Sequence, residues 1–166
     1  MLLVDLLARW AHVGSAIVLL GGAVFTRFVL LKAAAELPQD QHDALKARIR
    51  ATWSRFVSIG ILLLLLSGFY NFITKSIPQN KGNGLYHALM GTKILISLAV
   101  FFLASVLAGR SPKFEAWRQQ PKKWLTILIL LATLTAGIGS TLKVLAGVRS
   151  AKAAPPTALA PASTTP

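Results

Sequence analysis

Two ionisable side chains, His12 and Lys93, lie inside long apolar stretches of this 166-residue chain. An ionisable group in hydrocarbon costs about 2.5–3.5 kcal/mol on insertion scales, so it normally faces a bundle interior, a partner or a cofactor rather than lipid. Imidazole binds iron, copper and zinc, and an ammonium group can neutralise a carboxylate. His12 and Lys93 are therefore the candidate functional residues.

His87 and Met90 extend the set of possible ligands, because they precede Lys93 by six and three residues on the same stretch. His12 could bind haem b or a metal ion, with Lys93, His87 or Met90 as the second ligand or as the partner of a haem propionate. Copper is less favoured, because Cu(I) prefers sulfur ligands and the chain has no cysteine and only two methionines. A Cu(II) or other metal site would use His12 and His87.

Two interpretations without a cofactor stay open. In the first, Lys93 extends its stem to the lipid headgroups while His12 hydrogen-bonds a serine, an asparagine or a backbone carbonyl. In the second, the polar groups line a proton or ion path, although the apolar stretches contain no Asp or Glu to carry protons.

Four apolar stretches of about 20 residues must position these side chains, and each is long enough to cross a bilayer core about 30 Å thick. Because they do not alternate in polarity, they predict helices rather than a barrel. The expected fold is all-α, an integral membrane up-down-up-down four-helix bundle over residues 1–148 with spans at about 7–31, 55–75, 86–109 and 123–145. Residues 149–166 are predicted to form a disordered tail rich in Ala and Pro.

Basic residues predict the orientation of this bundle. Ten of the 18 Lys and Arg residues fall between spans one and two or between spans three and four, against six on the opposite side. The excess places both basic loops in the cytoplasm and both termini in the periplasm of a bacterial inner membrane. Anionic headgroups are the expected partner, and nucleic acid is not, because the basic residues flank apolar spans instead of forming an exposed stripe.

Depth and register bring polar groups to one level near the outer face. Counting 1.5 Å per residue from the basic end of each span places His12 roughly 7 Å and Lys93 roughly 5 Å below the outer boundary, with Asn71 and Ser140 at a similar depth. His12 shares a helix face with Ser15, Leu19 and Gly22, and Lys93 shares one with Tyr86, Met90 and Ser97. We expect both faces to point into the bundle.

Small residues indicate where helices approach one another. The expected contacts are Gly14, Val18, Gly21 and Gly22 in span one, Gly60, Ser67 and Asn71 in span two, and Gly137, Ser140 and Thr141 in span four.

Three segments carry a family resemblance over roughly residues 5–110: RWAHVGSAIVLLGGAVFTRFVL, LLLSGFYN and YHALMGTKILISLAVFF. They resemble the bacterial four-helix membrane proteins grouped around the copper-resistance D domain and the HemJ-type protoporphyrinogen oxidases. In the HemJ branch an early His of the first helix and a Lys of the third are tied to haem binding, which implies that role for His12 and Lys93. The copper-resistance branch implies copper handling at the inner membrane.

Three functions follow as expectations. The first is an inner-membrane protein resembling the copper-resistance D domain, with a haem or metal pocket near the outer face. The second is a haem-dependent protoporphyrinogen oxidase of the HemJ type. The third is a non-catalytic subunit of a larger membrane complex or a homo-oligomer. No nucleophile elbow, phosphate loop or paired acid motif occurs, which argues against hydrolases and nucleotide enzymes.

Overall fold

The computed structural model describes residues 2–153, with side chains for residues 2–145, and this part of the chain contains helices and short connections but no strand. Four of its helical stretches are long and apolar enough to cross a membrane: Leu2–Glu36, Gln39–Gln79, Gly84–Ala108 and Pro121–Leu145. The all-helical fold predicted from the sequence is confirmed at this level.

Two of the four stretches are continuous helices with short changes of pitch. The first comprises α1 (Leu2–Phe25), the π-helical turn η1 (Thr26–Leu30), α2 (Leu31–Ala33) and the 3₁₀ turn η2 (Ala34–Glu36). The second comprises α3 (Gln39–Asn71), the π-helical turn η3 (Phe72–Ser76) and α4 (Ile77–Gln79). The remaining elements are α5 (Gly84–Ala108), the 3₁₀ turn η4 (Pro112–Phe114), α6 (Glu115–Arg118) and α7 (Pro121–Ala153).

The helices extend beyond the spans predicted from hydropathy. The second begins at Gln39 rather than near residue 55, and α7 continues to Ala153, through residues 149–153 that the sequence analysis assigned to the tail. Hydropathy marks only the apolar part of a helix, whereas backbone hydrogen bonding continues into polar sequence until a helix-breaking signal occurs. The predicted tail at residues 154–166 lies outside the described residues.

Local sequence signals mark the residues at which α3 and α5 begin. Pro38 precedes α3 in an extended conformation, and Asn83 caps α5 by accepting a hydrogen bond from the Tyr86 amide at 3.2 Å. Gly82 has a φ of 75°, which a residue with a side chain rarely adopts, and so allows the tight turn before α5. The connection between α4 and α5 is therefore only four residues long.

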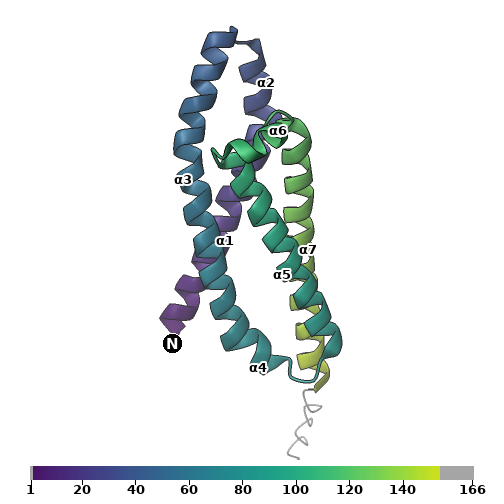
Figure 1. Cartoon of the computed structure of the whole chain (residues 1–166). Coiled ribbons are helices and arrows are strands. Elements are labelled where there is room, and N and C mark those ends of the chain that lie inside the picture. Colours follow the sequence, from purple (N-terminus) through teal and green to yellow (C-terminus); the bar gives the residue numbers. More distant parts are fainter. Residues whose placement is uncertain (1, 154–166) are drawn as a thin grey trace, which may run out of the picture.

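The helices associate as two pairs, α1 with α3 and α5 with α7, and the contacts between the pairs are fewer. Figure 1 shows the α2–α3 connection and α6 toward one end of the molecule and the α4–α5 connection at the other. The buried core between the pairs comprises Ala23, Leu103 and Leu128, packed against Trp117 and Trp124. We call the contact region between the two pairs the seam.

Both π-helical turns place a basic side chain on a neighbouring helix. In η1, the Nε atom of Arg27 donates to the Lys122 carbonyl at 3.0 Å and to the Thr126 hydroxyl at 2.9 Å, which fastens α1 to the start of α7. In η3, Lys75 lies 3.4 Å from the Asp5 carboxylate of α1. A π turn widens the helix by one residue and redirects the side chains within it, and here both redirected side chains lock helices together.

The connector between α5 and α7 folds back on the core. The Trp117 and Trp124 rings stack with centroids 4.1 Å apart and planes 1° from parallel. Arg118 is buried and its Nη2 atom donates to the Ser111 carbonyl and the Glu115 carboxylate, both at 2.6 Å. The Arg118 guanidinium holds the pKa of Glu115 below its ordinary value, so this ion pair persists in mildly acidic solution.

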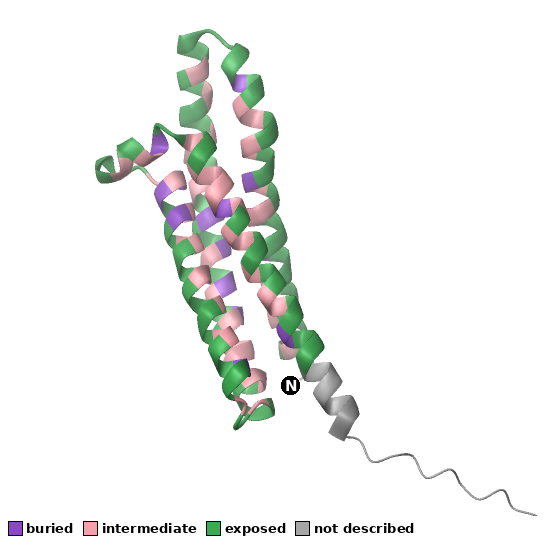
Figure 2. Ribbon diagram, turned by 90° about the vertical axis from the view of Figure 1, so that its right-hand side faces the viewer, coloured by how far each residue is buried: buried purple, intermediate pink, exposed green. Residues whose placement is uncertain are grey.

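Burial follows the arrangement expected for helices in lipid. Buried residues lie on inward-facing surfaces, whereas large apolar side chains such as Ile17, Leu66 and Leu95 are more than half exposed, and the exposed surface covers the outer faces of all four long helices (Figure 2). An exposed apolar surface of this extent needs an apolar solvent or a partner to cover it.

Close helix contacts occur at some of the predicted small residues and not at others. A Cβ on Gly22 would overlap the Trp53 ring, and one on Gly60 would lie 3.0 Å from Leu19. The expectation is wrong for Gly14 and Gly21 in span one, which have nothing within 4 Å of a built Cβ. It is also wrong for span four, where Gly137 has nothing within 4 Å of a built Cβ and Ser140 and Thr141 are exposed. The close approach there is at Gly139, which the sequence analysis did not select. The periodicity of small residues thus identified the correct turn of span four, but not the residue in it, Gly139, at which the helices approach.

The Gly22–Trp53 contact predicts a difference between adjacent glycines. Gly22→Ala should destabilise the α1–α3 pair by about 1–3 kcal/mol, because the added methyl group overpacks against Trp53. Gly21→Ala should be neutral or stabilising by up to about 1 kcal/mol, since its Cβ meets nothing within 4 Å and Ala favours helix. Unfolding of the purified protein in detergent, followed by Trp fluorescence, measures both. Equal stabilities of the two variants would contradict the packing described here.

Candidate functional site

His12 is held between α1 and α3 by a hydrogen bond to Ser67. Its Nδ1 atom lies 3.0 Å from the Ser67 Oγ atom. Ser67 is buried, and its hydroxyl also donates to the Leu63 carbonyl one turn back along α3. The hydroxyl has a single proton, and its short contact with the Leu63 carbonyl indicates that it donates there and accepts from Nδ1 of His12.

This arrangement assigns the tautomer of His12. Nδ1 carries the proton, and Nε2 is left with an unshared electron pair. A histidine whose one nitrogen donates to a neighbour while the other is free has the geometry of a metal-ligating histidine, in which the hydrogen bond fixes the ring orientation. His12 is half-buried, and its Cε1 atom lies 3.5 Å from a Cβ built on Gly68.

Lys93 occupies the other helix pair. It is half-buried on α5, and its ammonium nitrogen lies 3.1 Å from a Cβ built on Gly139, so the side chain extends against the α7 backbone. Within residues 2–145, the carboxylates that form ion pairs are Asp5, Asp43 and Glu115, and their partners are Lys75, His42 and Arg118. The Lys93 ammonium is therefore a cation without a carboxylate partner in this part of the chain.

His12 and Lys93 lie on opposite helix pairs. His12 contacts α3 through Ser67, and Lys93 contacts α7 at Gly139. We call His12, Ser67 and Lys93 the polar centre.

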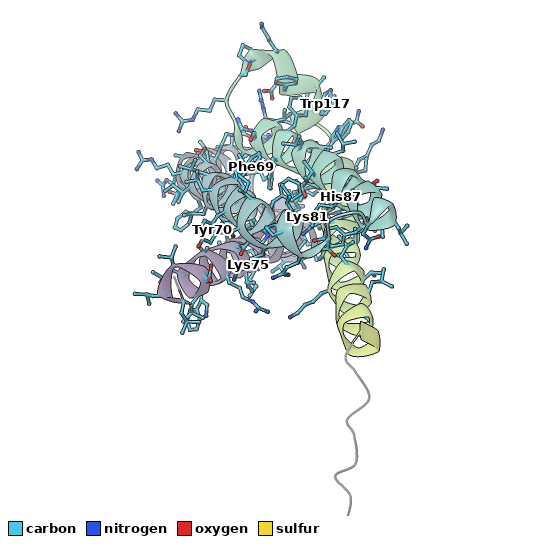
Figure 3. All side chains as sticks on the ribbon, turned by 90° about the horizontal axis from the view of Figure 1, so that it is seen from below. Phe69, Tyr70, Lys75, Lys81, His87 and Trp117 are labelled. Carbon is cyan, nitrogen blue, oxygen red and sulfur yellow. The ribbon has the colours of Figure 1, made fainter. Side chains whose placement is uncertain are left out.

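The remaining predicted ligands differ in position. Met90 is half-buried one turn before Lys93 on the same face of α5. His87 is exposed, and its ring packs edge-on against Tyr86 with centroids 5.9 Å apart. Seen from the α4–α5 end, His87 lies over α5, whereas Tyr70 and Lys75 lie beside α1 (Figure 3). Within the described residues no group of three or more His, Cys, Asp or Glu side chains could hold a metal ion.

The predicted polar layer is narrower than expected. Asn71 donates its side-chain amide to the Ser67 carbonyl of its own helix at 2.8 Å, and Ser140 is exposed. Ser67 is the partner that the sequence analysis placed only among packing residues. The signal that could have selected it is its position as the single hydroxyl in the apolar run GILLLLLSGF.

A second polar contact lies near the start of α1 in the α1–α3 pair. The Tyr70 hydroxyl donates to the Asp5 carboxylate at 2.9 Å, and the same carboxylate oxygen lies 3.4 Å from the Lys75 ammonium. Asp5 precedes His12 by seven residues, or about 10 Å along α1. This contact holds the start of α1 against the second helical stretch and thereby positions the helix that presents His12.

Comparison with known proteins identifies partial relatives. The chain is 33% identical over 78 residues to a UPF0344 protein of Staphylococcus haemolyticus, covering 47% of this chain and 57% of the relative. It is 30% identical over 80 residues, with the same coverage, to UPF0344 proteins of two Staphylococcus epidermidis strains. The chain thus spans little more than half the length of the curated relatives it matches. No family model and no solved structure matches it.

The polar centre predicts a particular histidine tautomer. In a His42→Gln, His87→Gln background, the single remaining His12 should carry its proton on Nδ1, and Ser67→Ala should release this preference. A hydrogen bond worth about 1 kcal/mol corresponds to about a fivefold change in the tautomer ratio. Nitrogen-15 NMR of the labelled imidazole measures it. A proton found on Nε2 in the parent protein would overturn the assignment.

Proposed function

We propose that this chain is a multi-pass protein of the bacterial inner membrane that binds haem b at the polar centre. The observation that carries the proposal is the hydrogen bond from His12 Nδ1 to Ser67, which leaves Nε2 free as a ligand in an apolar setting. Such an outer partner both orients a ligating imidazole and raises its basicity.

Lys93, which lies on the other helix pair, also favours haem as the ligand. Haem carries propionate groups, and a half-buried ammonium without a carboxylate partner among residues 2–145 favours an anionic ligand over a bare metal cation. A bare cation beside Lys93 would meet like charge, which argues against His12 as part of a simple metal site. The residues present therefore fit haem better than copper or zinc.

Met90 is the candidate for a second haem ligand. It shares the α5 face with Lys93 and is half-buried, whereas His87 is exposed near the start of α5. His12, alone or with Met90, would hold the haem. When bound, the haem would supply one-electron chemistry, and the chain would bind, orient and shield it. Copper transfer and porphyrinogen oxidation, which the family resemblance implies, stay predictions.

An absorbance spectrum tests the proposal. Protein purified from cells supplied with haem should show a Soret band that His12→Ala abolishes. Ser67→Ala should weaken haem affinity about 10–100-fold, because it removes the partner that orients the ligand. Lys93→Gln should weaken it without removing the iron ligand.

His42→Ala and His87→Ala serve as matched controls, since both replace a histidine outside the polar centre. They should leave the Soret band unchanged, and Met90→Leu should shift it only if the methionine is a ligand. A band that survives His12→Ala, or a purified protein without a band after haem supply, would exclude the proposal. Copper retained by a colourless protein would favour the copper-handling alternative.

We further propose that the four helices cross the membrane in an up-down-up-down order with both termini in the periplasm. The support is the distribution of charge: the α2–α3 region and the α5–α7 connector hold ten of the 18 basic residues, and Figure 1 shows them toward the same end of the molecule. Basic loops remain in the cytoplasm during insertion. This orientation puts the polar centre in the outer half of the bilayer.

Labelling of introduced cysteines tests this orientation, because the chain has no cysteine of its own. In intact spheroplasts, Lys81→Cys should react with a membrane-impermeant maleimide, and Lys113→Cys should react only after the cells are lysed. Both positions are exposed in the structure, so access alone does not separate them. The opposite pattern would invert the orientation and place the polar centre in the inner leaflet.

A further inference from the structure

An open groove runs along the outer side of the α1–α3 pair, away from the polar centre. It consists of two adjoining hollows with volumes of about 480 and 340 Å³. Both hollows include Val18 and Phe56, so they form one continuous surface. The lining is mostly apolar: Arg48 and Thr52 lie at one end, and the buried Ser15 borders the other half.

The length of the groove matches one leaflet. Along α3 it extends from Arg48 to Leu63, which at 1.5 Å per residue is roughly 22 Å. A bilayer including its headgroups is about 40–45 Å thick, so one leaflet measures about 20–22 Å. A groove with a cationic end and an apolar length of this size has the dimensions of a phospholipid lying along the protein.

The groove floor is rigid. Trp53 is fixed because its ring fills the space beside Gly22 and stacks on Phe56 with centroids 6.2 Å apart. Gly14 lines the far half of the groove, and a Cβ built there meets nothing within 4 Å. A larger side chain at Gly14 would therefore project into the groove without meeting a neighbouring residue.

We propose that this groove is a binding site for a single phospholipid with an anionic headgroup. Its acyl chain lies along Phe56, Ile59 and Gly14, and its phosphate group faces Arg48. Charge complementarity selects this occupant, because the open polar end of the groove presents a guanidinium, which pairs with phosphate through two hydrogen bonds. The proposal does not depend on haem binding, since the two sites share no residue.

Native mass spectrometry of the delipidated protein tests the proposed phospholipid site. Titration with dioleoyl phosphatidylglycerol should give one adduct at lower lipid concentration than dioleoyl phosphatidylcholine does. Arg48→Gln should weaken phosphatidylglycerol binding about fivefold, the effect of one basic side chain near an anionic headgroup. Arg48→Lys should retain most of the affinity, and Gly14→Leu should abolish the adduct by filling the hollow.

Two variants are matched controls. Arg55→Gln removes an exposed arginine from the same helix, and Gly91→Leu adds a leucine where nothing lies within 4 Å, both outside the groove. Neither should change binding. Equal binding of the two lipids, or equal loss in the controls, would overturn the proposal. A dimer that Gly14→Leu disrupts and Arg48→Gln does not would instead assign the groove to a second copy of the chain.

Discussion

The hydrogen bond between His12 and Ser67 is the interaction on which the interior of this bundle depends. Hydrocarbon offers no partner to a polar group, so each one must be satisfied within the protein or reach the membrane surface. Ser67 satisfies one nitrogen of His12 and returns its own proton to the Leu63 carbonyl. The second imidazole nitrogen, Nε2, makes no hydrogen bond to Ser67. Nδ1 thus holds the imidazole ring in place, and Nε2 remains available as a ligand.

The packing of the helices explains why such a group is tolerated at this place. Ala23, Leu103 and Leu128 close the seam near the connector, where Trp117 and Trp124 cover it. At the other end, Asp5, Tyr70 and Lys75 hold α1 to α3. Along α1, His12 lies between these two regions, since it falls between Asp5 and Ala23.

Much of the fold follows from the sequence because one constraint dominates it. Runs of apolar residues of membrane length specify helices whatever their detailed order, and helical register correctly placed Ser15 and Tyr86 on buried faces. The individual contacts between helices could not be predicted from the sequence. Ser67, Gly139 and the Asp5–Tyr70 contact join residues far apart in the chain, and their pairing depends on how one helix rotates against another. Periodicity gives the face of each helix, whereas this rotation is a property of the packed bundle.

The two proposed sites lie on the same helix pair and share no residue. Trp10 and Gly14 line the groove and stand two residues from His12, about half a turn around α1, whereas Ser15, which also lines it, stands about one turn from His12. A ligand held by His12 and a lipid in the groove would thus contact different side chains. The two sites are linked through α3, because Gly60 and Leu63 border the groove while Ser67, one turn further along, holds His12.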